Sequence, residues 1–197
     1  MIKAILFDVD GVLIDMTIEK AQEQLKRDWG ILPKETEYFF NHEFIDCLTG
    51  KADLKEILIP YLRKWRWNDS LNAFLDWWFA SQSDLNHELF LEIESIKKKQ
   101  ILCYVATNQE KYRTEYLINK LHFGKIFTNV FSSSHMGFTK KNPEFFRNVL
   151  KVIKLQPHEV IFWDDFPSYI ISAKSVGLHA ELYVNFTNFQ QTMKQYL

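Results

Sequence analysis

The stretch MIKAILFDVDGVLID, residues 1–15, indicates how the rest of the chain folds. Its apolar run, residues 2–7, is short and continuous, which is typical of a strand buried on both faces of a sheet. Asp8, Asp10 and Gly11 follow this strand directly. In an open parallel sheet, ligands bind beyond the carboxyl ends of the strands. The first strand therefore predicts an acidic functional site at that edge.

From about residue 84 the sequence alternates between strand and helix patterns. Strands are predicted at 101–106, 129–133, 160–163 and 179–184. Helices are predicted at 86–99, 110–122, 142–154 and 167–176, with a final helix at the C-terminus. This alternation predicts a parallel sheet joined by right-handed crossovers. The expected fold class is α/β, with a Rossmann-like three-layer core.

Residues 16–83 interrupt the alternation after the first strand, with helical spacing throughout. Helices are expected to begin at Thr17, at Pro33, near Leu54 and at Asn68 or Asp69, the second of them running to near Gly50. We interpret this segment as a small all-α helical-bundle cap, inserted into a discontinuous catalytic core of residues 1–15 and 84–197.

The predicted cap holds five tryptophans, which would fill the core of a small bundle. They are Trp29, Trp65, Trp67, Trp77 and Trp78. One or two of them could face the catalytic crevice. The basic cluster Arg63, Lys64 and Arg66 is typical of a solvated face, although one of these side chains could reach a second anionic group on a substrate.

Polar residues also follow the other predicted strands. They are Thr107 with Asn108, Lys140 with Lys141 in a loop, and Asp164 with Asp165. Two carboxylates about 4 Å apart repel by roughly 4 kcal/mol at an effective dielectric of about 20, so such a cluster needs a cation. Carboxylate oxygens favour Mg²⁺, which leaves room for substrate phosphate. A metal, a lysine and several hydrogen-bond donors around a carboxylate are what phosphoryl transfer requires.

Four motifs, in order, resemble those of the haloacid dehalogenase-like superfamily. They are DVDG (8–11), Thr107, Lys140 within GFTKKNPEFF (137–146), and the Asp pair 164–165. The helical insertion after the first motif resembles the first cap class of that superfamily. The chain is similar to the subgroup that contains small sugar-phosphate phosphatases and the phosphatase domain of epoxide hydrolases.

The resemblance implies a role for each matching residue. Asp8 would be the nucleophile that forms an aspartyl-phosphate, and Asp10 the general acid and later the base. Asp8, Asp165 and the backbone carbonyl of Asp10 would hold Mg²⁺, with Asp164 reaching it through water. The phosphate-binding positions would be Thr107, Asn108 and Lys140.

The sequence departs from the family pattern at several positions. Lys141 and Asn142 stand where the family often has Pro and Asp. Phe166 and Tyr169 stand where it often has a small hydroxyl residue and an Asn or Asp. Fewer polar groups around the metal ligands predict a weaker hold on magnesium.

The composition of the chain limits its expected binding partners and cellular compartment. Of the 197 residues, 47% are hydrophobic and 25% charged, and the net charge of -1 gives no basic footprint for nucleic acid or anionic lipid. No run approaches the about 20 apolar residues of a membrane span. The two cysteines lack metal-site spacing, which favours a reducing compartment. We expect a cytoplasmic monomer or weak homodimer that acts on a small phosphorylated metabolite, with no nucleic-acid or membrane partner.

Three alternatives stay open besides a Mg²⁺-dependent phosphatase. A phosphotransferase of the sugar phosphomutase type uses the same aspartates but returns the phosphoryl group to its substrate. A 2-haloacid dehalogenase shares the fold and the nucleophile without a metal, although Asp10 and the pair 164–165 argue against it. A non-enzymatic binding module is the third.

Overall fold

The computed structural model describes residues 1–197, apart from the side chain of Ile18, and over this range five strands form one parallel sheet in the order β3-β2-β1-β4-β5. The strands are β1 (Ala4–Phe7), β2 (Leu102–Thr107), β3 (Val130–Ser132), β4 (Val160–Asp164) and β5 (His179–Leu182). Phe7, the last residue of β1, pairs with Val105 on one side and Trp163 on the other. Asp8 therefore emerges at the centre of the sheet. The five parallel strands, connected by helices, confirm the predicted α/β fold.

Helices cover both faces of the sheet because the side chains of β1 alternate between two cores. Ile5 and Phe7 belong to one core and Ala4 and Leu6 to the other. The first face carries α6 (His87–Lys98), α7 (Lys111–Asn119), α8 (Phe123–Ile126) and α12 (Phe186–Met193). The second carries α10 (Pro143–Ile153) and α11 (Pro167–Ser175), with the short helix α9 (Ser133–Met136) after β3 and a 3-10 turn, η2 (Pro157–Glu159), before β4.

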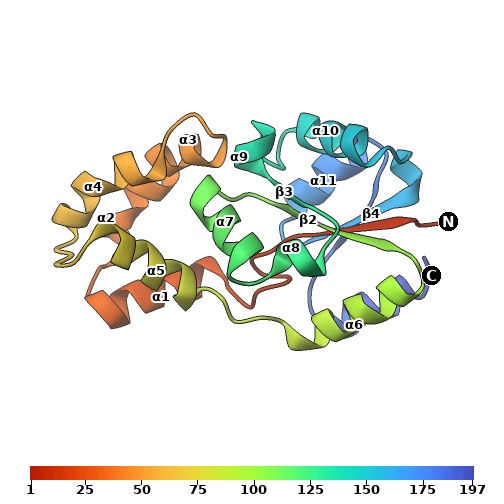
Figure 1. Cartoon of the computed structure of the whole chain (residues 1–197), viewed down its shortest axis with the longest axis horizontal. Coiled ribbons are helices and arrows are strands. Elements are labelled where there is room, and N and C mark those ends of the chain that lie inside the picture. The colour runs from red at the N-terminus through yellow and green to blue at the C-terminus, as the bar shows by residue number, and fades with distance from the viewer.

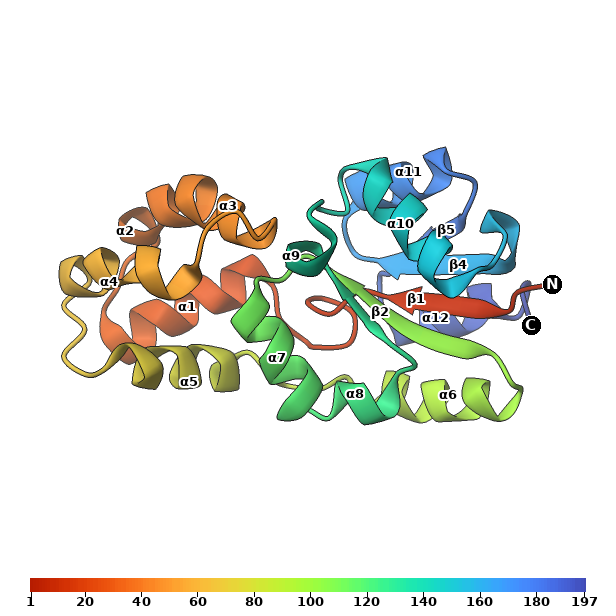
Figure 2. The same ribbon diagram turned by 45° about the horizontal axis from the view of Figure 1, so that its top comes forward.

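A helical insertion separates β1 from α6. It comprises α1 (Ile18–Trp29), α2 (Pro33–Tyr38), the π-helical segment η1 (Phe39–Glu43), α3 (Phe44–Leu48), α4 (Leu54–Lys64) and α5 (Leu71–Ser81). Figure 1 shows these helices at one end of the molecule and both chain termini at the other. β1 runs from the N-terminus toward the insertion (Figure 2), so the carboxyl ends of all the parallel strands face it.

The boundaries of three helices differ from the sequence-based expectations. The predicted helix from Pro33 to near Gly50 contains a π-helical segment between two α-helices. The predicted helix 110–122 divides into α7 and α8. Ser70, rather than Asn68 or Asp69, caps α5: its Oγ accepts from the backbone N–H of Ala73 at 3.1 Å, while the Asp69 carboxylate accepts from the Ser70 N–H. A serine one residue closer to the helix meets the capping geometry equally well.

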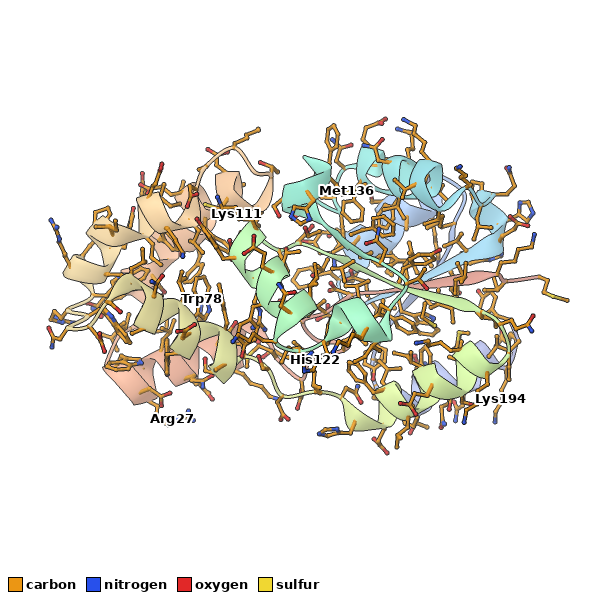
Figure 3. The ribbon with its side chains drawn as sticks, viewed as in Figure 1. Arg27, Trp78, Lys111, His122, Met136 and Lys194 are labelled. Atoms are coloured by element: carbon orange, nitrogen blue, oxygen red, sulfur yellow. The ribbon has the colours of Figure 1, made fainter. Side chains whose placement is uncertain are left out.

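The insertion has an aromatic-rich core of its own, to which α7 adds Tyr112 and Tyr116. Polar contacts join the same parts. Lys111 Nζ lies 2.5 Å from Asp53 Oδ2, and Arg113 donates to the carbonyl oxygens of Phe79, at 2.6 Å, and Gln82. Arg113 thereby satisfies carbonyls that the end of α5 leaves free. Figure 3 labels Lys111 where α7 approaches the insertion.

No helix in the part of the chain that the structure describes is both long enough and apolar enough to cross a membrane.

Candidate active site

Asp8 lies directly at the end of the central strand. Its backbone N–H donates to the carbonyl of Trp163 at 2.9 Å, which continues the pairing of β1 with β4 by one residue. The residue is only 6% exposed. One carboxylate oxygen, Oδ1, lies 2.5 Å from Nζ of Lys140. The sheet therefore fixes the position of Asp8, and Lys140 balances its charge.

Lys140 is a buried ammonium group between two carboxylates. Its Nζ lies 2.5 Å from Asp8 and 2.6 Å from Asp164, and its side chain is 1% exposed. Burial alone would lower the pKa of Lys140, but the negative charges of Asp164 and Asp8 raise it well above its usual value. The side-chain oxygen of Asn108 accepts from the Lys140 backbone N–H at 2.9 Å. Lys140 thus stays charged and is held in place.

Three carboxylates, those of Asp8, Asp164 and Asp165, offer oxygens that lie within 4.8 Å of one another. Burial, and then the charge of Asp8, raises the pKa of Asp164 to about 7 and that of Asp165 to about 6. Lys140 alone does not balance this cluster, and hard carboxylate oxygens are the ligands that Mg²⁺ prefers. The donor set therefore fits a magnesium ion.

Asp10 lines the same cavity as Asp8 but belongs to a different hydrogen-bonding environment. Gln109 donates from Nε2 to Asp10 Oδ2 at 2.5 Å. The other oxygen, Oδ1, is buried and has no hydrogen-bond partner among the described residues. Burial raises the pKa of Asp10, the nearby Arg113 lowers it, the Asp8 charge raises it, and the net direction is upward. This environment favours a carboxyl group that can hold a proton.

The turn after Asp10 brings Gly11 against the second acidic motif. Gly11 has φ +82°, a left-handed conformation that favours glycine, and its N–H donates to the carbonyl of Ile14 at 2.9 Å. A Cβ atom built at this position would lie 2.3 Å from Oδ2 of Asp165. Glycine therefore suits this position for two reasons. It adopts the left-handed backbone conformation, and its lack of a side chain leaves room for the Asp165 carboxylate.

Gly11→Ala is expected to destabilise the protein more than Gly30→Ala. Both glycines have left-handed backbones, where alanine costs roughly 1–2 kcal/mol, but among the described residues no atom beyond the adjoining chain lies within 4 Å of a Cβ at Gly30. Only the change at Gly11 must also displace Asp165. Urea unfolding of both variants measures the difference in the free energy of unfolding. Equal losses would show that the Asp165 side chain moves aside freely.

The predicted phosphate-binding residues gather around the same cavity. Thr107 is buried at the end of β2, and Thr107, Asn108 and Lys140 all line the cavity with Asp8. The side-chain oxygen of Asn108 is already engaged with the Lys140 backbone, so this residue also orients the lysine. Phosphate binding by these three residues stays a prediction.

The cavity has a volume of about 490 Å³ and lies between the carboxyl edge of the sheet and the insertion. The insertion and the segment leading into it contribute Met16, Thr17, Glu19, Phe44, Leu48 and Trp78 to its wall. Trp78, labelled in Figure 3, is the cavity-lining residue among the five tryptophans of the predicted cap. Arg63, Lys64 and Arg66 are exposed and lie outside the lining of this cavity.

Residues 2–177 match the model of the haloacid dehalogenase-like hydrolase family. The chain belongs to this family. In sequence, this haloacid dehalogenase-like hydrolase is 26% identical to a drimenol cyclase of Aspergillus calidoustus, over 59% of this chain and 25% of that protein. It is 25% identical to bifunctional epoxide hydrolase 2 of Rattus norvegicus, over 56% of this chain and 21% of that protein. The chain thus spans a quarter or less of the length of these relatives.

Solved structures share the fold of this haloacid dehalogenase-like hydrolase over nearly its whole length. A predicted family member from Porphyromonas gingivalis has a TM-score of 0.80 at 21% identity, covering 100% of this chain and 98% of that one. A family enzyme from Bacteroides thetaiotaomicron, solved with magnesium and inorganic phosphate, has a TM-score of 0.77 at 18% identity, covering 96% and 99%. An L-2-haloacid dehalogenase of Xanthobacter autotrophicus has a TM-score of 0.67 at 16% identity, covering 99% and 83%.

Two departures of this hydrolase from the family pattern form an aromatic wall. The rings of Phe166 and Tyr169 stack with centroids 5.4 Å apart, and both residues line the cavity. Nζ of Lys140 lies 4.9 Å from the centre of the Tyr169 ring, close enough for a cation–π contact. Tyr169 therefore contacts the lysine instead of adding an oxygen ligand near the acidic cluster.

Sequence patterns alone missed two residues that shape this site. Gln109 holds Asp10, and Arg113 joins α7 to the end of α5. Gln109 directly follows Thr107 and Asn108 in the sequence, so its place was a usable signal. Arg113 gave none, because its partners are backbone carbonyls that lie 30 or more residues away.

Proposed function

We propose that this hydrolase is a magnesium-dependent phosphatase that hydrolyses a small phosphorylated metabolite through an aspartyl-phosphate intermediate. The observation that carries the proposal is the position of Asp10. Its carboxyl group, held by Gln109, lines the same cavity as Asp8 and has a second oxygen that finds no hydrogen-bond partner among the described residues. An alkoxide is a poor leaving group unless it is protonated, whereas a halide needs no proton. Asp10 therefore favours a phosphate ester as the substrate.

In the first half of the reaction, a carboxylate oxygen of Asp8 forms a bond to phosphorus as the bond from phosphorus to the ester oxygen breaks. Asp10 gives its proton to the departing oxygen, which leaves as an alcohol. Lys140, already next to Asp8, neutralises part of the negative charge on the phosphoryl group. Thr107 and the backbone of Asn108 would orient the phosphoryl oxygens.

In the second half, Asp10 is a carboxylate and can accept a proton. A water molecule attacks the phosphorus of the aspartyl-phosphate and passes a proton to Asp10. The bond between phosphorus and Asp8 breaks, and inorganic phosphate leaves. Asp8 and Asp10 then have their original protonation states, so one ester and one water give one alcohol and one phosphate.

Asp8, Asp165 and the backbone carbonyl of Asp10 would hold the magnesium ion, with Asp164 acting through water. When bound, the metal would supply positive charge that stabilises the phosphoryl oxygens. Asp164 has a further role in this structure, because it accepts from the Phe166 backbone at 2.8 Å and pairs with Lys140. It therefore positions the lysine as well.

The related proteins support this assignment in part. The Bacteroides thetaiotaomicron enzyme binds magnesium and inorganic phosphate, whereas the Xanthobacter autotrophicus enzyme is a dehalogenase. Since both resemble this chain in fold alone, the site must decide between them, and Asp10 with the acidic cluster favours the phosphatase. We also propose that residues 16–83 form a cap over a core of residues 1–15 and 84–197, since the cavity lies between these parts.

Phosphate release from p-nitrophenyl phosphate tests the proposal. We expect release to require Mg²⁺, to stop with a chelator and to return when Mg²⁺ is restored. Asp165→Ala should raise the Mg²⁺ concentration for half-maximal rate more than Asp164→Ala, because loss of a direct carboxylate ligand weakens binding more than loss of one acting through water. Asp164→Ala should instead lower the thermal stability, because Lys140 loses a buried partner.

The opposite order of Mg²⁺ requirements would reverse the roles given to the two aspartates. Halide release from 2-chloropropionate without magnesium, together with no release of phosphate, would contradict the phosphatase assignment itself.

A further inference from the structure

The part of the cavity wall that the insertion side provides is mainly apolar. Phe44, Leu48 and Trp78 from the insertion, and Met16 from the segment leading into it, face the space in which the leaving group of a substrate must lie. The volume of about 490 Å³ is in the range of small-ligand sites. A substrate bound with its phosphoryl group at Asp8 would therefore place its organic group against hydrocarbon and aromatic surface.

Positive charge is scarce around this space. Among the described side chains, Lys140 is the cationic residue that lines the cavity, and its ammonium group is already shared between Asp8 and Asp164. Glu19, which also lines the cavity, adds negative charge. A second phosphate or a carboxylate on the substrate would have no cation to pair with here, and burial of an unpaired charge is costly.

Three basic side chains of the insertion and of α7 have partners outside the cavity. Arg66 pairs with Glu35 at 3.1 Å, and Lys111 pairs with Asp53. Arg113 donates to the carbonyls at the end of α5. Arg63, Lys64 and Arg66 are exposed and do not line the cavity, so their positions do not support the hypothesis that one of them reaches a second anionic group.

The residues of the apolar wall are closely packed against their neighbours. The Trp78 ring packs against Phe40 at 5.6 Å, Phe44 at 5.8 Å and Phe74 at 5.9 Å between centroids. A Cβ on Gly50, just after α3, would lie 2.8 Å from the carbonyl of Ser134, so the end of α3 rests on the core. These packing contacts place the wall in the cavity that Asp8 also lines.

Resting on the proposed phosphatase function, we infer that the substrate is a phosphate monoester whose organic group is apolar and carries no second anionic group. A sugar fits this wall less well, because its several hydroxyl groups would lose water, and the polar side chains on the insertion side are few, namely those of Thr17, Glu19 and Gln82. Bisphosphates, including the activators of phosphomutases, fit least. The substrate class is therefore narrower than phosphorylated metabolites in general.

The test compares primary alkyl phosphates, whose leaving groups are chemically alike. We expect kcat/KM for phosphate release with Mg²⁺ to rise from ethyl to butyl to hexyl phosphate, by at most about fourfold per methylene group and by roughly tenfold to a hundredfold overall. The kcat/KM for hexyl phosphate should also exceed the values for glucose 6-phosphate and 1,6-hexanediol bisphosphate. A higher kcat/KM for either of these two than for hexyl phosphate, or no dependence on chain length, would overturn the inference.

A matched pair of variants on α3 locates the effect. Leu48→Arg places a cation in the wall, so it should flatten the dependence on chain length and raise kcat/KM for the bisphosphate relative to hexyl phosphate. Ile45→Arg adds the same charge at an exposed position of the same helix outside the cavity. This variant should keep the wild-type ratios of kcat/KM between the alkyl phosphates and the bisphosphate. If thermal unfolding shows that Leu48→Arg does not fold, Leu48→Gln replaces it. This variant adds no charge, but its polar amide should also flatten the dependence of kcat/KM on chain length. Unchanged ratios in a folded Leu48 variant would contradict the inference.

p-Nitrophenyl phosphate separates this inference from the proposed function. If it is hydrolysed with Mg²⁺ while the alkyl series shows the wrong order, the phosphatase assignment holds and the substrate class is wrong. If no ester, including p-nitrophenyl phosphate, releases phosphate, the proposed function fails and the inference fails with it.

Discussion

Asp8→Asn is expected to lower the rate of phosphate release by several orders of magnitude while the fold persists. The amide keeps the size of the side chain but lacks the negative charge that attacks phosphorus. The buried Lys140 retains Asp164 at 2.6 Å, so the substitution does not leave an isolated buried cation. The measurement is phosphate release from p-nitrophenyl phosphate at saturating Mg²⁺, with circular dichroism to verify the fold.

Asp15→Asn is the matched control for this prediction. It makes the same chemical change at a largely exposed carboxylate, which pairs with Lys20 at 2.8 Å outside the cavity lining. Its rate should stay close to that of the wild type. Turnover of purified Asp8→Asn near the wild-type rate would contradict the covalent mechanism.

Asp10→Asn should affect alkyl and aryl phosphates differently. An alkyl ester needs both the acid and the later base, and each typically contributes 10²–10⁴-fold, so its turnover should fall sharply. An aryl ester has a better leaving group and needs less help to form the intermediate. With that substrate the variant should release a burst of product and then stall as an aspartyl-phosphate on Asp8.

Rapid-mixing kinetics with both substrates, together with intact-protein mass, measures these effects. The mass should show a phosphorylated protein after the burst with the aryl ester. Equal rates of the wild type and Asp10→Asn on the alkyl ester would remove Asp10 from the acid and base roles. A fall of similar size for both esters without a phosphorylated protein would place its effect on binding or folding.

The gathering of the site residues was predictable because a parallel sheet imposes it. Asp8, Thr107 and Asp164 each lie at or just beyond the end of a strand, and strand ends in such a sheet share one edge. The order of the strands was not needed for that conclusion. Helix starts such as that at Thr17 were also predictable, since its side chain accepts from Lys20 within the same short segment.

Other features depend on how distant segments pack, which local patterns do not encode. The apolar wall arises because Leu48 and Trp78 lie on different helices that turn toward the same space. Arg113 looks like an ordinary surface residue in sequence, yet it is 4% exposed and bonds to the end of another helix. The orientation of each insertion helix, on which the inferred substrate preference rests, therefore requires the structure.

The two chain termini lie at the end of the molecule opposite the insertion and the cavity (Figure 1). An affinity tag, a fluorescent partner or a surface tether attached at either terminus would therefore extend away from Asp8 and from the apolar wall. Immobilising the protein by one end should leave access to the cavity unchanged. The molecule is thus suited to surface-based measurements of substrate binding and phosphate release.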